Sequence, residues 1–362
     1  MRDLLGQVLT VLRDQPVALA RIVDRTGAAP RDVGAAMAVT GAGRVIGSLS
    51  GGCVEAAVLT TAAEVLLDGA ASLERFAADD ELTAGLPCGG EIEVFVERLD
   101  PTAAPLLREL RDALTAHRPL AYATTLAATP DRKLFYPGST EPWRDLDRDA
   151  AALLAAGRSG LIGAQDCTPA AAHRPRTFVQ VFGCPARLIL AGANDYTRAL
   201  TVTAAQLGYH VTVVDARETF TTAARFPAAH AVVVDWPHRY LTAEQHAGRL
   251  DDRTVVCVLT HDPKFDVPTL ATALQLPALA FIGALGSRRA HTDRTRRLRE
   301  LGLPEATLAR VRSPLGLDLA AHTPEETAIS ILAEILATRG QTSARPLSAL
   351  TGPIHRRPHH AP

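Results

Sequence analysis

The stretch Arg187-Leu188-Ile189-Leu190-Ala191-Gly192-Ala193-Asn194-Asp195-Tyr196-Thr197 decides the fold of the second half of this chain. Residues 187–191 are the apolar run of a buried strand. Residues 196–207 have the periodicity of a helix, which ends at Gly208. A strand, a glycine-containing turn and a helix in this order are typical of the first unit of a Rossmann-like sheet.

The same alternation continues toward the C-terminus. Short apolar runs predict four further strands, at 211–214, 231–234, 254–259 and 278–282. Short apolar strands that alternate with helices favour a parallel, doubly wound sheet. A last helix follows Thr323-Pro324-Glu325-Glu326, which has the composition of a capping box with proline in the first turn. We therefore predict a Rossmann-like domain over 187–339 and a disordered Pro-, Arg- and His-rich tail over 340–362.

The first half has a different pattern. Residues 37–40 and 44–47 flank Gly41-Ala42-Gly43 and predict a hairpin. Residues 54–67 have helical periodicity and stop at Asp68-Gly69. Further helices are expected at 4–12, 106–116 and 147–156, and further strands at 17–23, 92–97, 120–126, 133–136 and 177–182. The predicted fold class is α/β, with a mixed α+β N-terminal domain over 1–186 ahead of the Rossmann-like doubly wound domain.

Composition limits the function classes. The chain has 362 residues, 47% of them hydrophobic, and a net charge of −1, which gives no general attraction to nucleic acid or anionic membranes. We find no apolar run long enough for a transmembrane helix and expect a cytoplasmic protein. Five cysteines without a C-x-x-C pair argue against a disulfide framework or a zinc ribbon.

Two stretches place a cysteine beside a glycine pair. Gly51-Gly52-Cys53 is followed by Glu55 at the start of the helix predicted at 54–67, and Cys88-Gly89-Gly90 leads into the strand predicted at 92–97. Thiols and backbone N–H groups that converge would suit an anionic, sulfur-rich or metal-bearing ligand. The alternative is two tight turns with buried structural cysteines. Because the pattern occurs twice, we favour a joint site.

The turn after the first strand of the second half matches a dinucleotide fingerprint only in part. Gly192 fits the pattern, but Asn194 stands where a second glycine would let the backbone approach a pyrophosphate. Asp215, at the end of the next strand, is placed for a ribose hydroxyl. Two interpretations stay open: a sheet that has lost its NAD site, or a site that still binds a nucleotide or a pterin.

Two later turns also follow strands. Thr260-His261-Asp262 lies at the carboxyl edge of the predicted sheet, where open α/β sheets bind ligands. Gly286, Ser287, Arg288 and Arg289 follow the fifth strand and open a helix, so they are candidates for a phosphate cradle. The alternative is a helix cap with two solvated arginines. We interpret Pro314-Leu315-Gly316-Leu317-Asp318 as a structural turn.

Together these motifs resemble one family. The two cysteine loops look like signatures of the N-terminal domain of XdhC/CoxI proteins. Leu259-Thr260-His261-Asp262, the turn around Gly286, Pro314-Leu315-Gly316-Leu317-Asp318 and the helix start at Thr323 look like its Rossmann-like C-terminal domain. The resemblance extends over residues 10–338. One departure is Gly192-Ala193-Asn194-Asp195, where the family usually carries Gly-Ala-Gly-His.

The resemblance implies an accessory protein for molybdenum hydroxylases such as xanthine dehydrogenase. Such proteins bind the molybdenum cofactor (molybdopterin), protect it during sulfuration by a cysteine desulfurase, and pass it to the apo-enzyme. They are typically homodimers, and we expect a carrier rather than a catalyst.

The same resemblance gives the candidate residues their roles. Cys53 and Cys88 would lie near the molybdenum, and Glu55 would orient the loop. Amide donors would come from Gly51, Gly52, Gly89 and Gly90. In the second half, Gly192, Asn194, Asp215, His261, Gly286, Ser287, Arg288 and Arg289 would contact the cofactor. Two rival functions stay open: an NAD(P)-binding oxidoreductase, and an interaction module without a ligand.

Overall fold

The chain forms two compact units, Met1–Cys184 and Pro185–Thr351, described here one at a time. The computed structural model describes residues 1–27, 29, 31–52, 54–77, 90–139, 141–163, 175–276 and 279–351. The boundary predicted between the two domains lies two residues beyond this division. No helix among the described residues is long and apolar enough to cross a membrane.

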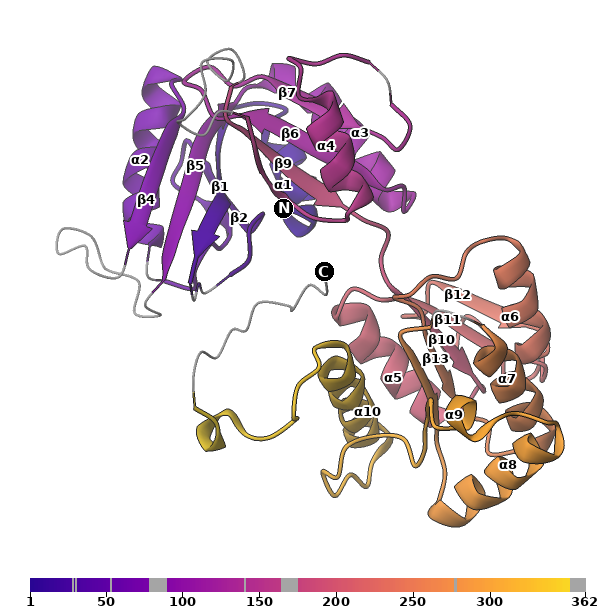
Figure 1. Cartoon of the computed structure of the whole chain (residues 1–362). Helices are drawn as coiled ribbons and strands as arrows, with labels where there is room; N and C mark the ends of the chain where they lie inside the picture. Colours follow the sequence, from indigo (N-terminus) through magenta and orange to yellow (C-terminus); the bar gives the residue numbers. More distant parts are fainter. Residues whose placement is uncertain are drawn as a thin grey trace. The chain divides into compact units, whose positions relative to one another are not determined.

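The first unit contains two antiparallel sheets (Figure 1). The five-stranded sheet has the order β3-β2-β1-β5-β4, with β1 (Val17–Thr26), β2 (Ala36–Thr40), β3 (Val45–Gly47), β4 (Ser72–Ala77) and β5 (Glu91–Leu99). The four-stranded sheet has the order β7-β6-β9-β8, with β6 (Leu120–Thr125), β7 (Arg132–Phe135), β8 (Gly160–Ile162) and β9 (Thr177–Phe182).

Helices α1 to α4 belong to the described part of the first unit. They are α1 (Leu5–Val11), α2 (Glu55–Asp68), α3 (Ala104–Thr115) and α4 (Asp147–Ala155), with single 3-10 turns at Arg2–Leu4 and Pro101–Ala103. Helix α2 packs Val58, Ala62 and Val65 against one face of the five-stranded sheet. It ends at Gly69, whose φ of 82° confirms the predicted helix stop.

A buried ion pair joins the two sheets of the first unit. Arg21 of β1 is fully buried, and its Nη2 donates to Glu97 Oε1 of β5 and to Thr124 Oγ1 of β6, both at 2.7 Å. Arg132 Nη2 lies 2.6 Å from the second carboxylate oxygen of Glu97. Burial, reinforced by the charge of Glu97, raises the pKa of Tyr122 to about 12, so this neighbour stays neutral.

The second unit has one parallel sheet with strand order β12-β11-β10-β13-β14-β15. The chain runs outward from β10 to β12 on one side and returns to β13 on the other, which places the topological switch point between β10 and β13. The strands are β10 (Arg187–Ala191), β11 (His210–Asp215), β12 (Ala231–Val234), β13 (Val255–Val258), β14 (Phe281–Ala284) and β15 (Val311–Arg312). The predicted Rossmann-like, doubly wound α/β architecture is confirmed.

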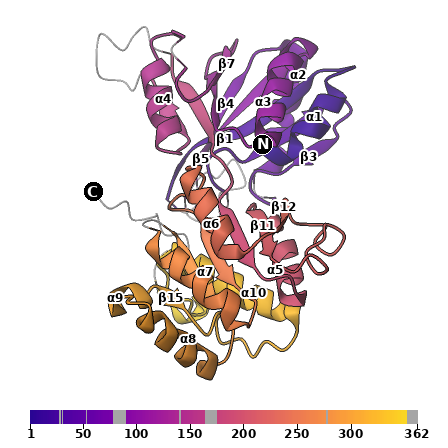
Figure 2. The ribbon, with the colours of Figure 1, turned by 90° about the vertical axis from the view of Figure 1, so that its right-hand side faces the viewer.

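Helices cover both faces of this sheet (Figures 1 and 2). α5 (Asp195–Gln206) and α10 (Pro324–Arg339) lie side by side and bury alternate strand residues such as Leu188 and Leu190. α6 (Pro237–His246), α7 (Pro263–Gln275) and α8 (Arg288–Glu300) cover the other face, where Ile189 and Ala191 point. The short helix α9 (Glu305–Leu308) and a 3-10 turn at Leu347–Ala349 complete the unit.

The predicted element pattern differs from the structure at a few places. The fifth strand of the second unit begins at Phe281 rather than at 278 and ends at Ala284 rather than at 282. Strands β4, β8 and β15 are additional to the predicted elements, because β4 has neither a regular alternation nor a continuous apolar run and the other two have only three and two residues. The capping box at Thr323 and Glu326 is confirmed.

Candidate functional site

The loop ahead of α2 wraps around one carboxylate. Glu55, the first residue of α2, accepts hydrogen bonds from four backbone N–H groups and two hydroxyls. The N–H donors are those of Leu49 (3.1 Å), Ser50 (2.8 Å), Gly51 (2.9 Å) and Gly52 (2.8 Å), and the hydroxyls are Ser48 Oγ (2.8 Å) and Ser50 Oγ. We expected these amides to face a ligand, and here they bind the protein's own carboxylate.

Partial burial raises the pKa of Glu55, but the hydrogen bonds from Ser50, Ser48 and Gly51 outweigh it and hold the pKa well below its usual range. Glu55 is therefore ionised and fixes the shape of the loop. Cys53, Cys88 and Gly89 lie outside the described residues, and Gly90 directly precedes β5. Whether the two cysteine loops meet stays a prediction, as do the contacts of both thiols with a metal. Among the residues that the structure describes, no cluster of His, Cys, Asp and Glu has three members placed to hold a metal ion.

The crossover after β10 is closely packed. Gly192 has a φ of 119°, and a Cβ there would lie 2.9 Å from Thr260 Cγ2, so glycine is required where this loop passes the end of β13. Asn194 is the N-cap of α5, because its Oδ1 accepts a 3.0 Å hydrogen bond from the Thr197 N–H. Its Nδ2 donates to Leu259 O at 2.7 Å. Asn194 thus occupies the helix end at which other Rossmann folds bind a pyrophosphate.

Asp215, at the end of β11, is 1% exposed. Its carboxylate accepts hydrogen bonds from the Ala193 N–H at 2.8 Å and from the backbone and guanidinium of Arg217 at 2.6 to 2.9 Å. Burial raises the pKa of Asp215, and the Arg217 and Ala193 hydrogen bonds lower it further than burial raises it. Both oxygens are engaged within the protein, and a contact between Asp215 and a ribose stays a prediction.

Two cavities adjoin at the carboxyl ends of β13 and β14, and both are lined by His261 and Gly286. His261 follows β13 with a φ of 58°, which is uncommon for a residue with a Cβ and typical of functional turns. Gly286 follows β14, and a Cβ on it would lie 3.1 Å from the Arg294 guanidinium and 3.3 Å from Ala290 Cβ. The two turns singled out in the sequence therefore meet in space.

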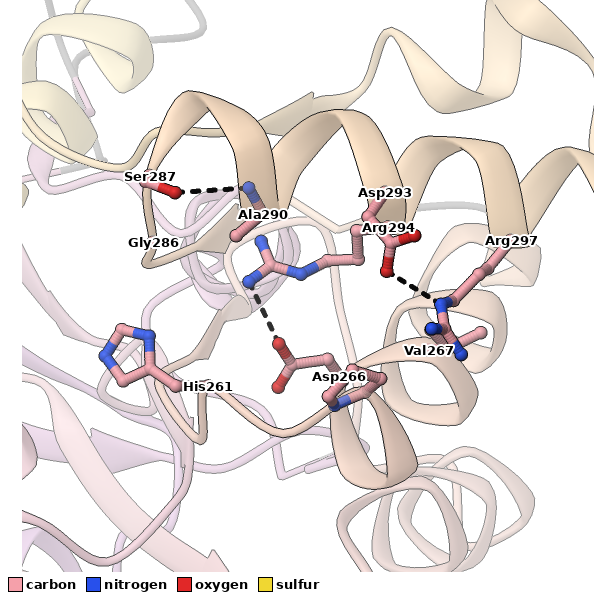
Figure 3. A pocket seen from close by; sticks show the side chains of 10 residues that line it. His261, Asp266, Val267, Gly286, Ser287, Ala290, Asp293, Arg294 and Arg297 are labelled. Atoms are coloured by element: carbon pink, nitrogen blue, oxygen red, sulfur yellow. Dashed lines mark hydrogen bonds and ion pairs between the residues drawn. The ribbon is translucent and has the colours of Figure 1, made fainter.

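The first cavity, about 250 Å³, lies between α7 and α8 (Figure 3). At its base the buried side chains of Arg294 and Asp266 form an ion pair, with Nη2 2.9 Å from Oδ2. Asp266 also accepts a hydrogen bond from the Thr260 hydroxyl, and Arg294 Nη2 donates to Leu285 O at 2.9 Å. This network ties the ends of β13 and β14 to both helices, so it fixes the cavity wall.

The rim of the first cavity carries groups that suit a phosphate. Ser287 caps α8, with its Oγ 3.2 Å from the Ala290 N–H, and lines the cavity together with Arg297. Arg297 Nε donates to Asp293 Oδ2 at 2.8 Å. A hydroxyl, a half-exposed guanidinium and a helix N-terminus are typical phosphate-binding groups.

Of the predicted cradle, Gly286 and Ser287 line this cavity, whereas Arg288 and Arg289 are exposed residues of the first turn of α8 and do not. Arg294 and Arg297, which also line this cavity, are not among the residues predicted from the sequence. Helical spacing was the available signal, because residues 287, 290, 294 and 297 of one helix share a face.

The second cavity, about 420 Å³, lies on the α5 and α10 side of His261. Its walls come from four places: Tyr196 of α5, the end of β14, the segment 315–321, and Thr327 and Ser330 of α10. Leu285, Leu315, Leu317 and Leu319 supply the apolar surface, and Asp318 the carboxylate. The volume is within the range of small-molecule sites.

Comparisons with known proteins agree with this architecture. Residues 188–335 match the XdhC Rossmann domain, and residues 11–77 match the XdhC and CoxI family. A crystal structure described as a xanthine dehydrogenase from Bacillus halodurans aligns with a TM-score of 0.69 at 24% identity, over 94% of this chain and 97% of that one. At that identity the likeness concerns the fold.

Two full-length relatives carry descriptive names. The molybdenum cofactor insertion chaperone PaoD of Escherichia coli (strain K12) is 27% identical over 335 residues, which is 92% of this chain and 86% of PaoD. A probable xanthine dehydrogenase subunit of Bacillus subtilis (strain 168) is 31% identical over 341 residues, which is 91% of this chain and 95% of that protein. On this coverage, and on the match of both of its units, the chain belongs to the XdhC and CoxI family.

Proposed function

We propose that this protein binds the molybdenum cofactor and delivers it to the apo-form of a molybdenum hydroxylase of the xanthine dehydrogenase type. The observation that carries the proposal is the pair of adjoining cavities at the carboxyl ends of β13 and β14, one with phosphate-binding groups and one lined by leucine side chains, two rings and a carboxylate. The cofactor has the same two chemical parts, a phosphate and a pterin. The name of PaoD, an insertion chaperone, supports the delivery step.

The residues present fit the phosphate of such a ligand. Ser287 Oγ and the Arg297 guanidinium would donate to it, whereas the buried Arg294 is balanced by its ion pair with Asp266 and holds the cavity wall. When bound, the cofactor supplies a molybdenum centre that exchanges oxygen and sulfur ligands and electrons. This chain's part is to hold that group, to shield it from water, and to release it to the apo-enzyme.

Further parts of the proposal follow from membership of the family. Cys53 and Cys88 would lie near the molybdenum, and the loop that Glu55 fixes would position Cys53. The partners would be the apo-hydroxylase and a cysteine desulfurase, and the protein would act as a homodimer in the cytoplasm. An NAD(P)-dependent oxidoreductase has less support, because Asn194 already caps the helix end that would bind the pyrophosphate.

The first test is purification of the protein without air from cells that make molybdenum cofactor. We expect molybdenum, measured by mass spectrometry, and pterin, measured by fluorescence after oxidation, each near one per chain. Absence of both, together with failure to bind added cofactor, would reject the carrier function.

The phosphate site has a matched pair of variants. Arg296 and Arg297 lie next to each other on α8 and both pair with Asp293, but only Arg297 lines the cavity. We expect Arg297→Gln to lower cofactor retention roughly fivefold, and Arg296→Gln to leave it unchanged. Equal retention in both variants would place the phosphate elsewhere.

A further inference from the structure

The segment Pro314-Leu315-Gly316-Leu317-Asp318 is firmly attached to α10. The Gly316 N–H donates to Glu334 Oε2 at 2.7 Å, and the Ser330 hydroxyl donates to Leu317 O at 2.6 Å. The Leu317 N–H donates to Ser330 O at 3.2 Å. Three hydrogen bonds over two residues fix the backbone just before Asp318, so the position of this carboxylate is set by the fold and not by a free loop.

Asp318 is an exposed carboxylate on the wall of the second cavity. In the part of the chain that the structure describes, its oxygens make no hydrogen bond or ion pair, unlike those of Asp215, Asp266 and Glu55. Tyr196 and His261 pack edge to ring on the wall of the same cavity, with ring centroids 6.5 Å apart. The cavity therefore combines apolar and aromatic walls with one carboxylate that can accept hydrogen bonds from a ligand.

The two cavities differ in charge, and this orients a ligand that spans them. A phosphate would be repelled by Asp318 in the second cavity. In the first cavity the carboxylates of Asp266 and Asp293 balance Arg294 and Arg297, and Ser287 Oγ and the half-exposed Arg297 guanidinium can donate to a phosphate. The end of the ligand in the second cavity must then offer a flat apolar surface and hydrogen-bond donors. His261 and Gly286 line both cavities, so one elongated molecule would contact the two.

We propose that Asp318 recognises the donor edge of a 2-amino-4-oxopyrimidine ring, which in this family's ligand is the pterin. That edge carries a ring N–H next to an amino group, two parallel donors that match the two oxygens of one carboxylate. The inference rests on the proposed function, since it is the molybdenum cofactor that supplies a pterin. Guanine has the same edge, so the experiment has to separate the two sources.

The test uses free pteridines and the full-length protein. Binding of pterin, lumazine and guanosine, none of which carries a phosphate, is measured at pH 7 by calorimetry. Lumazine has a carbonyl oxygen in place of the 2-amino group. That oxygen would face the Asp318 carboxylate, and the two acceptors would repel each other. We expect pterin to bind about tenfold or more tightly than lumazine, because a hydrogen bond to a charged group that is lost costs roughly that factor or more.

Asp318→Asn is the deciding variant. It should weaken pterin binding about tenfold and strengthen lumazine binding, because the amide no longer repels the lumazine carbonyl, and both changes remove the preference. Asp252→Asn is the matched control and should keep the preference. Asp252 is an exposed carboxylate that precedes β13, at the amino end of this strand, whereas both cavities lie at its carboxyl end. Thermal melting of both variants checks that they fold.

Three results would overturn the inference: equal affinity of the wild-type protein for pterin and lumazine, an unchanged preference in Asp318→Asn, or no binding of pterin at millimolar concentration. Tighter binding of guanosine than of pterin would assign the edge to a guanine ring instead. None of these results depends on the molybdenum and pterin content of the purified protein, which tests the carrier function. Failure of the ring assignment is therefore distinguishable from failure of the carrier function.

Discussion

At the scale of single residues, the contacts of Glu55 in the structure differ from those expected from the sequence motif. The sequence placed a glutamate close behind a glycine pair, and we expected the glycine amides to await an anion. In the structure the Gly51 and Gly52 N–H groups donate to Glu55 itself, at 2.9 Å and 2.8 Å. A carboxylate that accepts six hydrogen bonds from one short loop determines the shape of that loop.

We therefore expect Glu55→Gln to lower the free energy of unfolding by roughly 1–2 kcal/mol at pH 7, because a neutral amide accepts these bonds less strongly. The pKa of Glu55 is depressed in the folded protein, so its contribution is complete well above the unfolded pKa of about 4.3 and is lost progressively as the pH falls below about 5. Chemical denaturation of both proteins between pH 7 and pH 3 should show the difference shrinking. Glu64→Gln, an exposed change on α2, is the control, and a pH-independent difference would contradict the argument.

At the scale of elements, the segment 314–318 packs closely against α10, and this packing requires glycine at position 316. Its φ is 109°, and a Cβ there would lie 2.4 Å from Ser330 Oγ. Gly208, after α5, has a φ of 81° but open space around it. Both Gly→Ala changes impose backbone strain, and only the one at 316 adds a collision.

We expect Gly208→Ala to cost about 1 kcal/mol of unfolding free energy and Gly316→Ala at least about 1–2 kcal/mol more, measured in urea. Gly316→Ala should also weaken pterin binding, since Asp318 is held by this segment. If the two variants lost the same stability, the segment would be able to shift away from α10 and would not be a rigid support.

The elements that the sequence pattern predicted are helices with an apolar stripe, such as α2 and α10, and continuous apolar strands buried on both faces, such as β10 and β11. Those it missed, β4, β8 and β15, lie at sheet edges, where partners and not local pattern decide the pairing. The same limit applies to the site. The turns at His261 and Gly286 could be predicted because each follows a strand, whereas the contribution of Asp318 could not, because it depends on how a long connection returns to α10.

At the scale of the whole molecule, the two units are built independently. The first buries its own apolar clusters around α1, α3 and α2, and the second buries one cluster on each face of its parallel sheet. Every described residue that lines the two cavities belongs to Pro185–Thr351. The loop that Glu55 organises belongs to the other unit, so pterin recognition and any thiol chemistry are assigned to different parts of the chain.

This division predicts that residues 185–351, produced alone, fold cooperatively and keep the preference for pterin over lumazine seen in the full chain. Circular dichroism would follow unfolding, and calorimetry would give the two affinities. Residues 1–184 should also fold, because Arg21, Glu97 and Thr124 all lie within that segment, and should bind neither compound. A fragment 185–351 that folds but shows no preference would mean that the first unit contributes to the ring site, and the search for its residues would then turn to the cysteine loops.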